Sequence, residues 1–291
     1  MITVAIAFLG LAHADHHDHD HNHQANLDGV AEPCYDAAAA LQEEIAHGGS
    51  DYSEQAQQDF LLNYFAMATT FSPLHSAVPG EGGSGWVGVE LAGIPFLGCS
   101  RRLVLSGTKT EDTNKAPLAP RPRVLFQFKD VGKVKPYAGL GYVPPVTVFG
   151  TRNVIVSAEA GMGVSTESGF EWGLRYHATL MKTVAEIATP FNDDDPSELD
   201  FYVGSTFGGD AIVGYAVNER LKPYVSVGFT DASTFFYIGD DAVVSNNANP
   251  YASVVASAGA QWSLDRFEFA GEFYTAPGVI YTGRVRASLK L

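Results

Sequence analysis

Hydrophobic and polar residues alternate along most of the chain after Trp86. Apolar side chains recur there at every second position, which is the period of a β-strand with one apolar face. The clearest run has Phe170, Trp172, Leu174, Tyr176, Ala178 and Leu180 on one face and Glu171, Gly173, Arg175, His177, Thr179 and Met181 on the other. Such runs match the roughly nine to eleven tilted residues with which a strand crosses a bilayer.

The connections between these runs alternate in length. Tight polar turns are predicted around Gly132, 165–169, 218–220 and 264–266, and longer links at about 108–120, 145–151, 187–199 and 238–250. Short turns on one side and long loops on the other are typical of transmembrane barrels, whose short turns face the periplasm. Counting back from the C-terminus places the first strand near Leu97, with both barrel ends periplasmic. The segment 86–94 either adds strands or belongs to the preceding module.

We therefore predict an antiparallel transmembrane β-barrel of about ten to twelve strands over residues 85–291. A sheet whose strands all have one apolar face closes most naturally into a barrel with that face toward lipid, because a closed barrel leaves no open sheet edge in the hydrocarbon. A soluble β-sandwich is the alternative, although its strands would usually be shorter.

A small helical module is predicted ahead of the barrel, over residues 33–84. One helix is predicted over 33–47 and a second over 52–70, with Asp51 and Glu54 as a capping pair. Residues 79–85 are predicted to be a flexible linker. The second helix carries an aromatic stripe, Phe60, Tyr64 and Phe65, which needs a protein partner. We expect these helices to dock in the lumen or at the periplasmic mouth and to plug the pore.

The N-terminus indicates export. A short apolar run over residues 2–11 precedes Ala12-His13-Ala14, a small-x-small pattern typical of signal-peptidase sites. We predict a signal peptide over 1–14 and a His/Asp-rich disordered tail over 15–32. In an exported protein, Cys34 and Cys99 form either a disulfide or two free thiols.

The tail also carries metal-binding residue types: His16, His17, His19, His21 and His23. Neutral imidazoles suit zinc, nickel or copper, so adventitious binding is one interpretation and a solvated tail is the other. No cofactor is predicted.

Composition excludes several classes. No apolar run of about eighteen residues follows residue 11, which excludes a helical membrane protein. The net charge of −15 argues against nucleic acid as a partner, because phosphates require a basic face. Outer-membrane lipid and a small solute are the expected partners.

The polar strand faces supply the predicted lumen lining: Arg123, Gln127, Lys129, Glu159, Glu171, Arg175, His177, Glu268, Glu272, Arg284 and Arg286. Glu268 and Glu272 precede the strand that carries Arg284 and Arg286, which predicts a cross-strand ladder of ion pairs. The polar groups of the lining either pair only with one another or also set the selectivity of the barrel for solutes.

No enzyme is predicted. His177 could be combined with Ser157 or Ser205 and with Glu171, but a Gly-x-Ser-x-Gly motif is absent.

Residues 86–291 resemble Gram-negative outer-membrane β-barrels in their alternation, loop asymmetry and apolar C-terminal end. Leu291 stands where such proteins commonly have Phe or Tyr. The helical segment ahead of the barrel resembles the long-chain fatty-acid transporter family, whose N-terminal segment plugs the lumen. That family's Asn-Pro-Ala signature is absent here.

The resemblance implies an outer-membrane channel or transporter for small solutes, apolar ones included, with helices restricting the lumen. Two alternatives stay open: a structural or adhesive outer-membrane barrel, and an exported soluble metal-binding β-protein.

Overall fold

The computed structural model describes residues 25–111, 114, 117–148, 151–185, 200–238, 242–245 and 249–291. The predicted signal peptide and the histidines of the tail lie outside these residues. The elements are η1 (Glu32–Cys34), α1 (Tyr35–Ala46), α2 (Glu54–Thr69), β1 (Gly85–Gly93), η2 (Cys99–Arg101), β2 (Leu103–Val104), η3 (Leu105–Gly107), β3 (Lys109–Thr110), β4 (Leu118–Gln127), β5 (Lys135–Val148), β6 (Thr151–Ser165), β7 (Phe170–Ala185), β8 (Asp200–Tyr215), β9 (Leu221–Ile238), β10 (Ala242–Ser245), β11 (Ala252–Leu264), β12 (Phe267–Ala276) and β13 (Ile280–Lys290).

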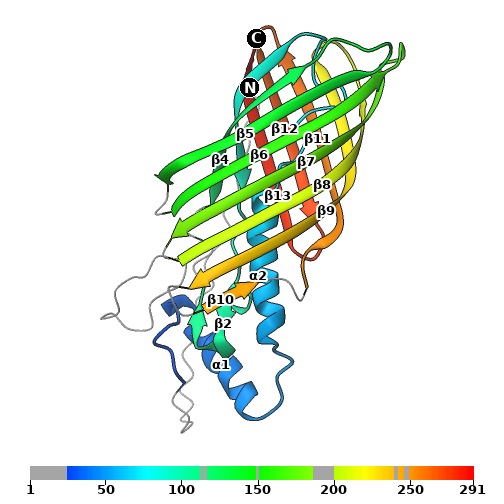
Figure 1. Cartoon of the computed structure of the whole chain (residues 1–291). Helices are drawn as coiled ribbons and strands as arrows, with labels where there is room; N and C mark the ends of the chain where they lie inside the picture. Colours follow the sequence, from blue (N-terminus) through cyan, green and yellow to red (C-terminus); the bar gives the residue numbers. More distant parts are fainter. Residues whose placement is uncertain are drawn as a thin grey trace, which may run out of the picture.

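Ten of the described strands close into an antiparallel barrel (Figure 1). Their order is β9-β11-β12-β13-β1-β4-β5-β6-β7-β8, and pairing of β8 with β9 closes the ring. β10 pairs only with β9 and stands outside the ring. The predicted fold class, a barrel preceded by helices, is confirmed at the low end of the expected strand count.

The first wall strand begins at Gly85, so the predicted start near Leu97 is wrong. β1 pairs with β4 on one side and with β13 on the other, and Val87 faces Val124 and Leu289 across these ladders. The region around Leu97 instead leads into 3-10 turns and the β2–β3 hairpin outside the wall. The predicted long link over 145–151 is also wrong, because β5 and β6 extend through it and only 149–150 separate them.

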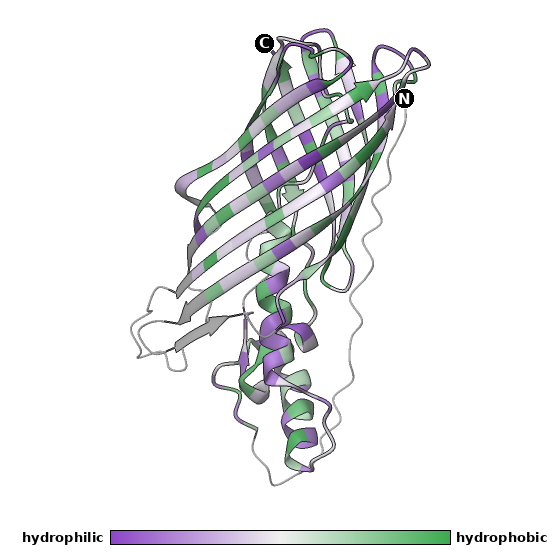
Figure 2. Ribbon diagram, turned by 45° about the vertical axis from the view of Figure 1, so that its right-hand side comes forward, coloured by the Kyte–Doolittle hydropathy of each residue, from purple (hydrophilic) through white to green (hydrophobic). Residues whose placement is uncertain are grey.

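The barrel wall has its polar face inside and its apolar face outside. Along β7, Trp172, Leu174 and Tyr176 are about half exposed, whereas Glu171 and Arg175 are buried. The ribbon coloured by hydropathy alternates along the strands in the same way (Figure 2). This is the reverse of a soluble β-protein and the arrangement that a surrounding bilayer requires.

The two ends of the barrel differ. One end, here called the turn end, carries the connections 128–134, 166–169, 216–220 and 265–266 together with the start of β1 and the C-terminus. The opposite end, here called the cap end, carries the connection 94–117 and α1, at the bottom of Figure 1. None of the helices in the described ranges is long and apolar enough to cross a membrane.

A small folded unit, here called the cap (residues 25–53 and 94–111), lies beyond the cap end. Cys34 and Cys99 form a disulfide within it, which settles the alternative that the sequence left open. Val30, Ala38 and Leu103 pack around Cys34 as a separate apolar cluster. The Ala31 amide donates to Thr110 Oγ1 at 2.7 Å, which ties the two parts of the cap together.

Both predicted helices are present, but the capping pair is wrong. Ser53, rather than Asp51, is the N-cap of α2, and its hydroxyl accepts from the Ala56 amide at 3.4 Å. The Glu54 carboxylate is engaged by the cap instead, because it accepts from the Leu105 and Ser106 amides at 2.9 and 2.8 Å. The contact fixes the start of α2 to the cap.

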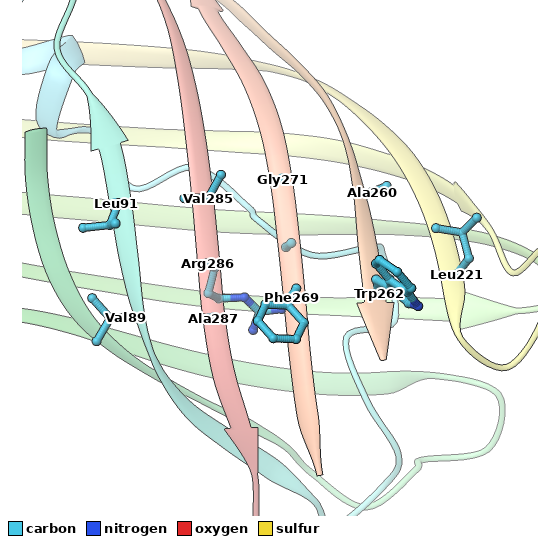
Figure 3. A pocket seen from close by; sticks show the side chains of 11 residues that line it. Val89, Leu91, Leu221, Ala260, Trp262, Phe269, Gly271, Val285, Arg286 and Ala287 are labelled. Carbon is cyan, nitrogen blue, oxygen red and sulfur yellow. The ribbon is translucent and has the colours of Figure 1, made fainter. Parts of the chain in front are cut away.

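The outer wall has a shallow apolar hollow of about 460 Å³ (Figure 3). It forms where the small residues Ala260 and Gly271 lie between the larger Leu91, Trp262 and Phe269. Most of its lining belongs to the outward face of the strands, as Val89, Trp262 and Phe269 do, so it is part of the surface expected to contact lipid.

This facing predicts the outcome of placing a charge on β13. Val285→Arg, near the middle of the outward face, should lower the free energy of unfolding in lipid by about 2–4 kcal/mol. Leu289→Arg is the matched control on the same strand and face but beside the turn end, where the cost should be about 0–1 kcal/mol. Urea unfolding in liposomes, followed by tryptophan fluorescence, measures both. Equal losses would contradict a bilayer around the wall.

Candidate functional site: the filled lumen

An extended segment of the chain, residues 70–80, runs through the barrel and is here called the lumen segment. It joins the end of α2 to the turn before β1, and residues 70–79 are all buried. Figure 1 shows α2 entering the barrel from the cap end. Pro73 and Pro79 favour extended backbone at the residues before them. Leu74 adopts a φ of 51°, which a leucine keeps only where its surroundings hold it.

Arginines of the wall bind the main-chain carbonyls of this segment. Arg123 donates to the carbonyl oxygens of Ser72 and Pro73 at 3.0 and 2.7 Å. Arg175 donates to the carbonyl oxygen of Phe71. Hydrogen bonds to a charged group contribute about 1.5–3 kcal/mol, more than those between neutral groups.

Two further arginines bind where α2 passes into the lumen segment. Arg121 donates to the carbonyl oxygens of Thr69 and Thr70 at 3.0 and 3.4 Å. Arg284 donates to those of Thr70 and Met67, the latter at 3.1 Å. These carbonyls lie at the end of the helix, where the last carbonyls run out of intrahelical donors, so the wall supplies donors there. The Met67 carbonyl also accepts from the Thr70 amide at 3.4 Å.

Acidic and amide side chains of the wall accept from the amides of the same segment. The donors Leu74, Ser76 and Val78 reach Glu272, Gln261 and Glu171, respectively, at 3.1, 3.1 and 3.2 Å. Closer to the turn end, Lys222 and Gln261 donate to the carbonyl oxygens of Val78 and Pro79, each at 3.1 Å. The wall therefore pairs the backbone of an extended chain that no β-ladder could pair.

The Phe71 ring lies among three of the arginines. The guanidinium carbons of Arg123, Arg121 and Arg175 are 3.9, 4.9 and 5.7 Å from its centroid. An aromatic face attracts cations, most strongly where water is excluded. Phe71 therefore anchors the lumen segment at the arginine cluster.

Carboxylates of the wall balance the buried arginines. Glu90 accepts from Arg121 and Arg123 at 2.9 and 3.3 Å. Glu159 accepts from Arg123 and Arg175 at 2.8 and 2.5 Å. Each arginine thus bridges a carboxylate and a backbone carbonyl, which offsets the cost of burying its charge.

Glycines of the wall make room for the segment. A β-carbon on Gly163 would overlap the carbonyl oxygen of Ala77, and one on Gly214 would overlap the hydroxyl of Ser76. One on Gly141 would lie 3.0 Å from the Phe71 ring. The inner wall is shaped to this segment.

The predicted flexible linker over 79–85 is wrong, because this stretch forms hydrogen bonds to the wall. The Gly83 amide donates to the Gln127 carbonyl oxygen at 2.9 Å, and the Gly80 amide donates to Gln127 Oε1 at 3.3 Å. Gly83 has a φ of 88°, the left-handed conformation that favours glycine and lets the chain reverse into β1.

The apolar part of α2 fills the lumen near the cap end. Phe65 packs on Tyr202 with ring centroids 5.4 Å apart, and the Tyr202 hydroxyl donates to the Leu62 carbonyl oxygen at 2.9 Å. Tyr64 donates to the Pro95 carbonyl oxygen. Phe60 lies under Arg101 of the cap, whose guanidinium carbon is 4.5 Å from its centroid. Phe65 thus lies against the lumen wall, Tyr64 binds the connection 94–117, and Phe60 faces the cap.

Most residues predicted to line the lumen are buried inside it. They are Arg123, Gln127, Glu159, Glu171, Arg175, His177, Glu268, Glu272, Arg284 and Arg286. Lys129 differs, because β4 ends at Gln127 and Lys129 is exposed in the turn that follows. The strand was expected to continue past the point at which it ends.

Only part of the predicted ion-pair ladder forms. Arg286 pairs with Glu268 at 2.5 Å. Arg284 stands opposite Glu272 in the register, but it binds the lumen segment and lies 3.8 Å from Glu90. Glu272 likewise turns to the Leu74 amide. The lumen segment competes successfully for both members of the second rung.

Sequence reasoning missed Glu90, Arg121, Asp210 and Gln261, as well as the lumen segment itself. Arg121 shares the parity of Arg123, so strand periodicity carries the signal that finds it. Glu90 was missed because β1 was not assigned to the wall. The lumen segment has neither helical nor strand periodicity.

The catalytic arrangement considered from the sequence does not form. The His177 Nδ1 atom has no hydrogen-bond partner among the described residues, and Nε2 lies 3.7 Å from Asp210. The Ser157 hydroxyl is engaged by Arg121 at 2.8 Å and by Thr179 at 3.1 Å. Ser205 lies on the outward parity of β8, on the other face of the wall.

No family model matches the sequence, and no curated protein matches it. Among solved structures, the toluene transporter TodX of Pseudomonas putida is 10% identical, with 79% of this chain and 75% of that chain covered and a TM-score of 0.35. The translocator domain of autotransporter NalP from Neisseria meningitidis is 10% identical over 89% and 99%, with a TM-score of 0.38. Ail of Yersinia pestis is 10% identical over 72% and 99%, with a TM-score of 0.32.

The chain folds as an outer-membrane-type β-barrel, and the resemblance expected from its sequence is confirmed at the level of the fold. The similar structures differ in what their names say they do, so they assign no activity to this chain.

The fit between wall and lumen segment predicts the effect of one added side chain. Gly163→Val should destabilise the protein by about 1–3 kcal/mol, because overpacking against a backbone atom forces a shift. It should also expose residues 70–80 to protease. Gly271→Val is the control, since a β-carbon there meets no atom within 4 Å. Urea unfolding and limited proteolysis in detergent measure both effects. Similar stability and protection in the two variants would contradict a filled lumen.

Proposed function

We propose that the protein is an outer-membrane barrel that anchors the cap on the external surface of a Gram-negative cell, with its lumen closed by its own chain. The observation that carries this proposal is the lumen segment, which is buried over residues 70–79 and whose backbone amides and carbonyls bond to wall side chains at many points along that length.

The orientation follows from the lengths of the connections. In outer-membrane barrels the short turns face the periplasm and the long connections face outward. The turn end of this barrel is then periplasmic, and the cap is external. The helices thus reach the lumen from outside rather than from the periplasmic mouth.

The construction of the cap fits a compartment outside the cytoplasm. It is fastened to the barrel by α2 and by the connection 94–117, and the Cys34–Cys99 bond joins its two parts. Disulfides persist in oxidising compartments. Its small cluster of Val30, Cys34, Ala38 and Leu103 would gain little stability without such a bond.

Labelling of intact cells tests this orientation. Gly49→Cys lies in the exposed link between α1 and α2, and Lys133→Cys, the matched control, lies in the exposed β4–β5 turn. A membrane-impermeant maleimide should label Gly49→Cys on intact cells and Lys133→Cys only after lysis. The opposite pattern would place the cap in the periplasm and overturn the proposal.

A solute channel is the second candidate, and the charged lining favours it. If the lumen segment moved away, water could hydrate the arginines of the lining, which are Arg121, Arg123, Arg175 and Arg284. The barrel would then conduct small solutes.

Solute flux separates the two candidates. Liposomes that contain the full unreduced chain should be no more permeable to small sugars than protein-free liposomes if the barrel is an anchor. Flux above that level would favour the channel if it persists in variants with a changed cap.

A further inference from the structure

The disulfide has a position in the fold that reaches beyond the cap. Cys34 and Cys99 are separated by 65 residues, and their Cα atoms lie 5.3 Å apart. Cys34 directly precedes α1, and Cys99 begins η2, a few residues after β1. Both therefore lie at the cap end, on either side of a long excursion of the chain.

That excursion passes through the barrel and returns in its wall. From Cys34 the chain follows α1 and α2 into the barrel, and the lumen segment carries it to the turn end. It reverses at residues 81–84 and returns to the cap end as β1. The disulfide closes this path into a covalent ring, one side of which fills the lumen while the other is a wall strand.

We propose that the Cys34–Cys99 disulfide is a topological lock that keeps the lumen segment inside the barrel. The segment could leave the lumen in two directions only. Exit toward the cap end is limited by residues 81–84, which join it to β1 and are hydrogen-bonded at Gly83 and Ser84. Exit toward the turn end requires residues 34–69 to follow through the barrel. The bond to Cys99, outside the wall, forbids this.

The nature of the contacts explains why a covalent lock matters. The lumen segment is held mainly by polar groups, such as the bonds of Arg123 to Ser72 and Pro73. Water can replace hydrogen bonds of this kind, and a charged lining regains hydration when it is uncovered. The contacts define where the segment lies, and the disulfide removes the path by which it would leave.

The lock is independent of which end of the barrel faces outward. It depends only on the covalent ring and on the filled lumen. The maleimide labelling can therefore contradict the orientation without contradicting the lock, and a conductance measurement can contradict the lock without contradicting the orientation.

Conductance of the full chain in planar bilayers tests the lock. The protein is measured unreduced and after treatment with a dithiol reagent, which gives two electrons and two protons to the sulfurs and yields two thiols. Urea is raised through concentrations that leave the barrel folded. The reduced protein should show channel openings at urea concentrations at which the unreduced protein is silent. Cross-linking a loop of 65 residues lowers the number of conformations of a fully unfolded chain by a factor of roughly a thousand. Since β1 stays in the wall here, this factor is the upper limit of the expected change in open probability.

Two controls make the outcome specific. Cys34→Ser/Cys99→Ser should open like the reduced protein and should not respond to the reagent. Tryptophan fluorescence recorded on the same samples should show that the barrel is intact.

Three results would overturn the proposal. The first is equal urea dependence of conductance before and after reduction of the wild-type protein. The second is loss of the barrel on reduction alone, because the bond would then hold the wall rather than the lumen segment. The third is a response of the cysteine-free variant to the reagent.

Discussion

The pairing of buried guanidinium groups with main-chain carbonyls is the interaction on which this structure depends. An extended chain inside a closed barrel has no neighbouring strand to take its hydrogen bonds, and a buried arginine has no water to take its protons. Arg123 meets both requirements at once, because it bonds to Ser72 and Pro73 on the lumen segment and to Glu90 and Glu159 on the wall. Neither the segment nor the lining would be stable in this arrangement without the other.

Other features of the barrel follow from this mutual dependence. Glycines face the segment where its backbone comes closest, as Gly163 does at Ala77. The lumen divides into a polar part around the segment and an apolar part around α2, where Phe65 packs on Tyr202. The helix contributes side chains and the segment contributes backbone, so together they fill the barrel with different chemistry at its two ends. The disulfide then joins the two ends of the chain stretch that contains α2, the lumen segment and β1.

Much of the wall could be predicted from the sequence, because the side chains of a strand alternate strictly between its two faces. The parity of β7 and β13 assigned Arg175, His177, Arg284 and Arg286 to the interior, and all four are buried there. The predictions were wrong where alternation does not determine the structure, at the end of one strand and at the start of another. The end of β4 depends on a turn that periodicity does not locate, which misplaced Lys129. β1 follows a glycine-rich stretch that reads as a linker.

The content of the lumen could not be predicted in the same way. Residues 70–80 contain Pro, Ser and His without a period, and such a segment reads as an exposed loop. Its burial is decided by partners on distant strands, for example Glu272 for the Leu74 amide and Gln261 for the Ser76 amide. The aromatic stripe of α2 did indicate a helix that needs a protein partner. The C-terminal part of that helix lies in the barrel, with Phe65 against Tyr202, whereas Phe60 faces the cap.

Amide hydrogen exchange of the lumen segment tests this account most directly. In the protein embedded in lipid, the amides of Leu74, Ser76 and Val78 should be protected to the same degree as those of the neighbouring wall strands, since each is buried and bonded to the wall. The amide of Gly49, in the exposed link between the helices, provides the unprotected reference in the same sample. Exchange of the three lumen amides at the rate of Gly49 would contradict the claim that the barrel is filled by its own chain.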